Sequence, residues 1–131
     1  MPLILLSIAA GASLGALLRF GLAEAFNHLW PNLPAGTLAA NLLGAFLMGL
    51  ALASFLALPN LPIAWRLFLT TGFLGGLTTF STFSAEAFLL LQRGEVEAVA
   101  IHVIAHVVGS LAATAVGFLT ARALWRPAVP G

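Results

Sequence analysis

The sequence predicts an all-α membrane protein with four transmembrane helices, the third of which is broken. Of its 131 residues, 61% are hydrophobic and only 7% are charged, whereas ordinary soluble domains are about 45–50% apolar and about 25% charged. So few charges cannot cover a globule in water, and lipid is the expected solvent. The length leaves room for about four spans with short loops, so we expect a single domain over residues 1–131.

Four apolar segments define the expected helices, at residues 3–26, 36–58, 62–91 and 96–125. Each reaches the roughly 20 residues that cross a ~30 Å hydrocarbon core. Short loops rich in Pro, Asn and Gly separate them. Trp30, Trp65 and Trp125 lie at segment ends, where indole rings favour the membrane interface. Small residues repeat at spacing four within the segments, as at Gly11 and Gly15, and predict close helix packing rather than a ligand role.

Charge and composition exclude several functions. A net charge of +1 gives no reason to expect a nucleic-acid partner. The chain has no Cys, so disulfides and thiol chemistry are excluded. It also has no Asp, which an intramembrane aspartyl protease requires, and no Ser and His are paired in a way that suggests a serine protease. We therefore expect no enzymatic activity.

The arginines give a weak orientation signal. With four spans, the N-terminus, the loop between segments 2 and 3, and the C-terminus share one side of the membrane. Arg66, Arg122 and Arg126 fall on that side, and Arg93 and Arg19 fall on the other. A three-to-two split barely biases insertion, so both orientations are expected. An inverted pair of copies is an established way to build a transport site.

Residues 75–84, GGLTTFSTFS, interrupt the third segment with two adjacent glycines and five Ser or Thr side chains. Irregular backbone at membrane depth is tolerated only inside protein or beside a watery cavity. Carbonyls freed by a break can bind a small cation such as Na⁺. The alternative is that the hydroxyls bond to their own helix and fill packing gaps. Five hydroxyls within seven positions favour a binding site.

Helical periodicity sorts the side chains after the break. If the helix resumes near Thr79, then Thr79, Thr82 and Glu86 share one face. They predict a polar track, beside a second face that carries Phe80 and Phe83. A carboxylate at membrane depth is costly and is therefore a functional candidate. The alternative for Glu86 is that it lies high enough in the membrane to reach water.

Four further polar residues lie within the apolar segments. Asn41 can bridge two helices or donate N–H groups to a passing anion, and Arg19 can extend to the interface. His102 and His106 have the i, i+4 spacing of a metal pair. No carboxylate or thiolate nearby in sequence completes a ligand set, so we expect these histidines to be packing or interface residues.

Residues 75–84 followed by Glu86 resemble the signature of the Fluc (CrcB) fluoride channels. GASLGALLRF at residues 11–20 and PAGTLAANLLGAFLMG at residues 34–49 are also similar to that family. The resemblance covers nearly the whole chain. It implies a dual-topology protein of the bacterial cytoplasmic membrane that forms an antiparallel homodimer with two pores. It also implies passive export of fluoride, which protects the cell from fluoride toxicity.

The resemblance further implies roles for particular residues. Phe80 and Phe83 would line the pore, Asn41 would be the pore asparagine, and Ser81 and Thr82 would belong to a hydroxyl track along the ion path.

The same resemblance implies a metal site and an entrance. Backbone carbonyls of Gly75 and Thr78 would hold a structural Na⁺ at the centre of the dimer, and Arg19 would lie near a pore entrance. Family members often carry a hydroxylated aromatic residue near position 104. This chain has Ile104 and no Tyr, so that part of the polar track departs from the family pattern.

Two other functions remain open on the sequence. One is a small proton-coupled exporter of the same dual topology, with Glu86 as the protonated carrier site. The other is a membrane assembly factor that transports nothing. Dependence of flux on a proton gradient separates the first from a channel, and the absence of any ion flux in purified liposomes would favour the second.

Overall fold

The computed structural model describes residues 1–126, which are mostly helical and contain no β-strand. Four helical stretches there are long and apolar enough to cross a membrane: Pro2–Leu29, Ala35–Ala57, Ile63–Gln92 and Val96–Trp125. They match the four predicted segments closely, and the all-α membrane class is confirmed. The last five residues of the predicted domain, 127–131, lie outside the described part.

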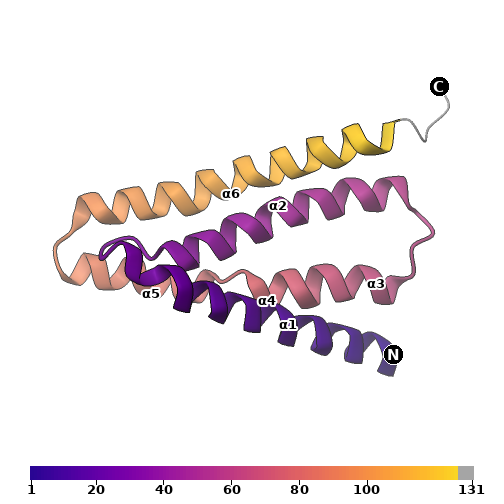
Figure 1. Ribbon diagram of the computed structural model, residues 1–131, viewed down its shortest axis with the longest axis horizontal. Helices are drawn as coiled ribbons and strands as arrows, with labels where there is room; N and C mark the ends of the chain where they lie inside the picture. The colour runs from indigo at the N-terminus through magenta and orange to yellow at the C-terminus, as the bar shows by residue number, and fades with distance from the viewer. Residues whose placement is uncertain (127–131) are drawn as a thin grey trace.

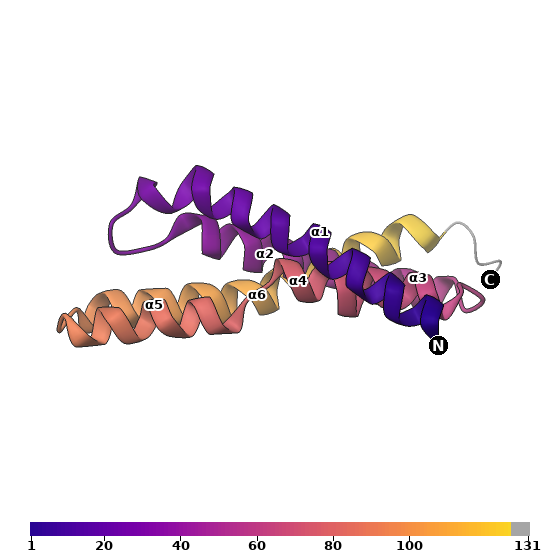
Figure 2. The same cartoon turned by 90° about the horizontal axis from the view of Figure 1, so that it is seen from below.

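The four stretches form an elongated bundle (Figure 1). α1 (Pro2–Phe26) continues into a short 3₁₀ turn, η1 (Asn27–Leu29), before α2 (Ala35–Ala57). The most extensive contact joins α2 to α6 (Val96–Trp125), while α1 packs on the third stretch. Figures 1 and 2 show the start of α1, the loop between α2 and α3, and the end of α6 at one end of the bundle. This is the arrangement expected for four crossings.

The third stretch is built from four pieces. They are α3 (Ile63–Leu67), the π-helix η2 (Phe68–Leu74), α4 (Gly75–Leu77) and α5 (Phe80–Gln92). Between α4 and α5 only Thr78 and Thr79 are extended, at φ −82°, ψ 154° and φ −148°, ψ 116°, and the gap is visible in Figure 2. The predicted break is confirmed, and the helix resumes at Phe80, one residue after the expected point.

The sequence suggested that the adjacent glycines of this region interrupt the helix, whereas in the structure glycines here allow close helix packing. Gly75 and Gly76 do not unwind the helix but remain helical in α4. A Cβ atom on Gly76 would lie 3.0 Å from the Cα of Ala12, and one on Gly11 would lie 2.8 Å from the Phe73 nitrogen. These glycines therefore let α1 approach the third stretch backbone to backbone. Gly49 of α2 approaches α6 in the same way, so the predicted close packing is confirmed.

Candidate functional site

The break is held by a side chain from another helix. Asn41 of α2 accepts a hydrogen bond from the Thr79 N–H on its Oδ1 at 2.7 Å. Its Nδ2 donates to the Thr79 carbonyl at 3.1 Å. An unpaired backbone N–H at membrane depth is costly, and the Asn41 amide supplies the acceptor that the interrupted helix no longer provides for Thr79. The Thr79 carbonyl, which as the N-cap carbonyl accepts the first bond of α5, receives a second donor from Asn41. The amide of Asn41 thus bridges two helices, which is one of its two predicted roles.

Arg19 holds the other side of the break. Its Nε donates to the carbonyl of Gly76 at 3.0 Å, and the side chain is half-buried between α1 and α4. Arg19 therefore bonds to the backbone beside the break, a contact that the sequence did not suggest. The physical reason is that a carbonyl next to an extended segment lacks its helical donor, and a nearby guanidinium supplies one. The suggested place near a pore entrance stays a prediction.

Some hydroxyl groups around the break form hydrogen bonds with neighbouring residues of the same segment, and others are exposed. Thr79 is the N-cap of α5, because its Oγ1 accepts from the Thr82 N–H at 3.1 Å and donates to the Thr82 hydroxyl at 3.0 Å. Thr78 donates its hydroxyl to the Leu74 carbonyl at 2.9 Å. Ser81 is exposed and lies 3.4 Å from the Thr79 hydroxyl. Thr79 and Thr82 therefore share a face, as the periodicity predicted.

Phe80 and Phe83 lie next to each other but in different surroundings. Their ring centroids are 5.6 Å apart with an interplanar angle of 58°. Phe80 is 78% exposed, whereas Phe83 is 8% exposed. The Phe83 ring stacks on His102 at 5.0 Å and lies 4.6 Å from His106. Phe83 is thus part of the packed interior of the bundle, and Phe80 projects from its surface.

An open groove of about 430 Å³ brings many of the predicted residues together. From the predicted site it is lined by Asn41, Gly75, Thr78, Thr79, Phe80 and Phe83. Ser81, Thr82, Arg19 and Glu86 are not part of its lining. A larger hollow of about 830 Å³ lies between the loop at Trp30 and the start of α6 and contains none of the predicted residues.

Sequence reasoning missed two hydroxyl groups in this groove. Ser110 and Thr114 of α6 line it together with His106. The three residues follow one another at spacing four, which places them on one helix face, and this spacing could have revealed them. Ile104, where the resemblance suggested a polar aromatic residue, does not line the groove.

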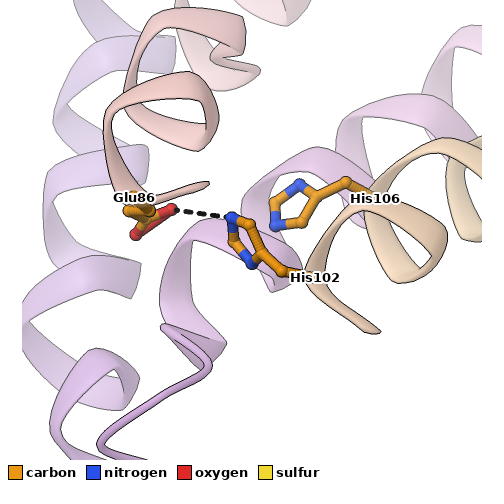
Figure 3. Close-up of side chains that lie close together, drawn as sticks. All are labelled: Glu86, His102 and His106. Carbon is orange, nitrogen blue, oxygen red and sulfur yellow. Dashed lines mark ion pairs between the residues drawn. The ribbon is translucent and has the colours of Figure 1, made fainter. Parts of the chain in front are cut away.

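Glu86, His102 and His106 form a buried cluster between α5 and α6, shown in Figure 3. Glu86 Oε1 lies 3.8 Å from His102 Nε2, and one potential ligand atom from each of the three residues lies within 4.8 Å of the others. The Glu86 side chain is only 15% exposed. The expected packing role agrees with the burial of both histidines and their contacts with Phe83. Packing of α5 on α6 also brings them a carboxylate that is distant in sequence.

Two bonds fix this cluster within the bundle. The Thr37 hydroxyl of α2 donates to Glu86 Oε2 at 3.0 Å. His106 Nδ1 lies 2.9 Å from Asn41 Nδ2. Thr37 thus anchors the carboxylate end of the cluster and Asn41 the histidine end, and through Asn41 the cluster adjoins the break.

Comparison with known proteins agrees with this architecture. The family described as CrcB-like protein, Camphor Resistance (CrcB), matches residues 6–118. The chain belongs to the CrcB family. In this CrcB protein the matched range contains the break, the groove and the buried cluster, and the four apolar helices make it a multi-pass membrane protein.

Several curated relatives of this CrcB protein carry the name fluoride-specific ion channel FluC. The one from Chromohalobacter salexigens is 56% identical, over 95% of this chain and 94% of its own length. The one from Tolumonas auensis is 53% identical, over 92% of this chain and 95% of its own. A third, from Cupriavidus pinatubonensis, is 51% identical, over 94% of this chain and 98% of its own length.

Proposed function

We propose that this chain is a fluoride-selective channel that lets F⁻ leave the cytoplasm passively and so limits fluoride toxicity. The observation that carries the proposal is the groove, which gathers Asn41, Phe80 and Phe83 beside the broken backbone. The chain is also 53% and 56% identical, over 92% and 95% of its length, to relatives named fluoride-specific ion channels. A channel requires no enzymatic chemistry.

The chemistry of the groove suits a small anion. Fluoride is strongly hydrated, so a pore must replace its water with hydrogen-bond donors. Ser110 and Thr114 offer neutral hydroxyls, and the edge of the exposed Phe80 ring carries partial positive charge. Neutral donors bind an ion without trapping it, as conduction demands. The hydroxyls of Ser81 and Thr82 belong to the same path if the partner subunit closes it.

The proposal includes an antiparallel homodimer. In a lone protomer the groove exposes extended backbone and polar side chains, which lipid cannot satisfy. A second copy with the same groove covers it through a self-complementary, two-fold contact. When the two-fold axis lies in the membrane plane, the copies have opposite orientations. Phe80, a large aromatic side chain that projects from the protomer, then lies within the assembly.

A structural Na⁺ at the centre of that dimer completes the proposal. Within residues 1–126 the carbonyl oxygens of Gly75 and Thr78 accept no hydrogen bond, while those of Leu74 and Thr79 do. Both residues line the groove. Two copies therefore provide four free carbonyl oxygens, which are suitable ligands for a hard cation.

Fluoride efflux from liposomes that contain the purified full-length protein tests the function. A fluoride electrode records efflux after a potassium ionophore removes the electrical barrier, with chloride-loaded liposomes as the control. Rapid fluoride efflux with little chloride efflux is expected. No efflux above that of empty liposomes, or equal efflux of both anions, contradicts the proposal.

The alternative function is a proton-coupled exporter that uses Glu86. Its burial beside two histidines favours it as a proton-binding carboxylate. The same liposomes distinguish the two functions, because a channel needs only a fluoride gradient and an electrical shunt. If efflux instead requires a pH gradient and Glu86→Gln removes that requirement, the exporter is correct.

A further inference from the structure

We propose that Glu86, His102 and His106 form a binding site for a divalent transition metal of the Zn²⁺ class. One ligand atom from each residue lies within 4.8 Å of the others, and the three side chains converge in Figure 3. Two imidazoles and one carboxylate are a ligand set that Zn²⁺ accepts, with a fourth position left for water. The site does not depend on the proposed fluoride conduction.

Burial and missing partners indicate that something occupies the space between these side chains. His102 is fully buried and His106 is 4% exposed. Among the described residues, Glu86 Oε1, His106 Nε2 and His102 Nδ1 are buried and have no hydrogen-bond partner. His102 Nε2 lies 3.4 Å from the Phe83 carbonyl, a contact that metal binding at Nε2 replaces. Leaving a buried polar atom unpaired costs about 1–3 kcal/mol. A metal ion satisfies Glu86 Oε1 and His106 Nε2 together, and a buried water is the competing occupant.

The surroundings of Glu86 orient its carboxylate for such a role. The Thr37 hydroxyl donates to Oε2 at 3.0 Å, and Thr37 is itself held by Asn27, whose Oδ1 accepts from the Thr37 N–H at 3.0 Å. These bonds occupy one carboxylate oxygen and leave Oε1 facing His102 Nε2 at 3.8 Å. Outer-shell partners of this kind fix ligand orientation in metal sites.

Only modest movement is needed to close the site. Ligand atoms of a tetrahedral Zn²⁺ with bonds near 2.1 Å lie roughly 3.3–3.5 Å apart. The widest separation of 4.8 Å must therefore shrink by about 1.5 Å, which side-chain rotations provide. His106 also lines the open groove, so an ion can reach the cluster from there.

Metal binding at His106 competes with the bond to Asn41. The two contacts to Thr79 fix the orientation of the Asn41 amide, so its Nδ2 donates to His106 Nδ1 at 2.9 Å. The proton of the neutral imidazole is then on Nε2. When a metal binds Nε2, that proton leaves, and a proton taken up on Nδ1 keeps the ring neutral. Nδ1–H then faces the N–H of Asn41, so metal binding opposes this contact.

A cobalt titration of the purified full-length protein in detergent tests the site. Co²⁺ replaces Zn²⁺ and gives visible ligand-field absorption when it is tetrahedral, and added Zn²⁺ should abolish that absorption. Glu86→Gln, which keeps the side-chain size and an acceptor for Thr37, should weaken binding at least about tenfold. His102→Gln should do the same. His28→Ala is the matched control, because His28 is exposed and lies outside the cluster.

The coupling to Asn41 gives a result that a surface site would not. Asn41→Asp places a carboxylate that accepts from Nδ1–H, so it should tighten Co²⁺ binding by about tenfold. Size-exclusion profiles establish that each variant is folded. Absence of tetrahedral absorption in the folded unmodified protein overturns the proposal and assigns the space to water. Loss of absorption in His28→Ala but not in Glu86→Gln overturns it as well.

Discussion

Asn41 pairs both backbone groups of Thr79, accepting from its N–H at 2.7 Å and donating to its carbonyl at 3.1 Å. Its second amide hydrogen is directed to His106 Nδ1 at 2.9 Å. Both N–H donors of Asn41 are therefore used within the protomer. An anion that receives a hydrogen bond from Asn41 must displace one of these two contacts. The longer bond, to the Thr79 carbonyl, is the less costly one to lose, because that N-cap carbonyl keeps the first intrahelical bond of α5.

Substitution of Asn41 should destabilise the break. Asn41→Leu has similar volume but leaves the Thr79 N–H without its acceptor, so we expect a loss of about 1–3 kcal/mol in the free energy of unfolding. Denaturant unfolding in detergent measures it. Asn41→Ser, which keeps a small polar side chain but cannot reach both groups, is the control and should lose a similar amount. A Leu variant as stable as the unmodified protein would show that Asn41 does not support the break.

Arg19 should contribute to stability through a single bond. Arg19→Met keeps an apolar stem and removes the donor to Gly76, which we expect to cost about 1.5–3 kcal/mol for a bond to a charged group. Arg93→Met is the matched control, because Arg93 is exposed in the turn before α6. Unfolding midpoints of the two variants should differ clearly. Equal midpoints would assign Arg19 a role other than holding the break.

Substitutions at two neighbouring glycines should distinguish packing within the protomer from assembly of the dimer. A Cβ atom on Gly76 would press against the backbone of Ala12, whereas one on Gly75 would meet nothing closer than the Thr70 carbonyl at 3.6 Å. Gly76→Ala should therefore destabilise the protomer by about 1–3 kcal/mol. Gly75→Val should leave the protomer folded but weaken the dimer and reduce its bound sodium, if Gly75 faces the two-fold axis.

Unfolding curves, light scattering after size exclusion and atomic emission of sodium measure these three effects. The expected sodium content of the unmodified dimer is about one ion per dimer, since one two-fold axis holds one central ion. A Gly75→Val protein with normal dimer stability and normal sodium content would contradict the sodium clamp.

Replacement of either phenylalanine should reduce fluoride flux, but the two replacements should differ in their effect on protomer stability. Phe80 is exposed on the protomer, so Phe80→Ile should change protomer stability by less than about 0.5 kcal/mol. Phe83→Ile also loses its contacts with His102 and His106, for an added cost of about 0.5–1.5 kcal/mol. Fluoride efflux should fall strongly in both. Full efflux from stable dimers of both variants would refute the pore assignment.

Reporter fusions test the dual topology. Arg19 bonds the Gly76 carbonyl at the break, so it is left out of the count of arginines that flank the membrane. That count then sets Arg66, Arg122 and Arg126 on one side against Arg93 on the other. Arg66 also bonds three carbonyls of the loop between α2 and α3, at 2.8–3.1 Å. With so few charges we expect C-terminal reporters to be active on both sides of the membrane. Two extra arginines beside Pro59 should fix one orientation and remove function when expressed alone. Activity on one side only in the unmodified chain contradicts the antiparallel dimer.

Much of the site could be predicted because its residues are close together in the sequence. Phe80 and Phe83 are three residues apart on α5, and Thr79 caps the same helix and bonds to Thr82. The role of Ser110 and Thr114 was missed because two hydroxyls in an apolar helix are commonly satisfied by that helix. Their place in the groove depends on how α6 packs on α2.

The sequence by itself determined the four membrane spans and the presence of a break in the third. A bilayer fixes how long an apolar helix must be, and it penalises irregular backbone so strongly that ten polar and glycine-rich residues at that depth identify an interruption. The glycines at positions 11 and 15 similarly indicated close packing, since small side chains permit it against any partner helix.

Only the tertiary structure decided which side chains serve the break and which gather around Glu86. Asn41 meets Thr79 across 38 residues, Arg19 meets Gly76 across 57, and Thr37 meets Glu86 across 49. Contacts at such separations depend on the rotation and depth of each helix in the bundle, which side-chain packing sets and periodicity alone leaves open. For this reason the histidine pair of α6 had no visible carboxylate in the sequence and has one in the fold.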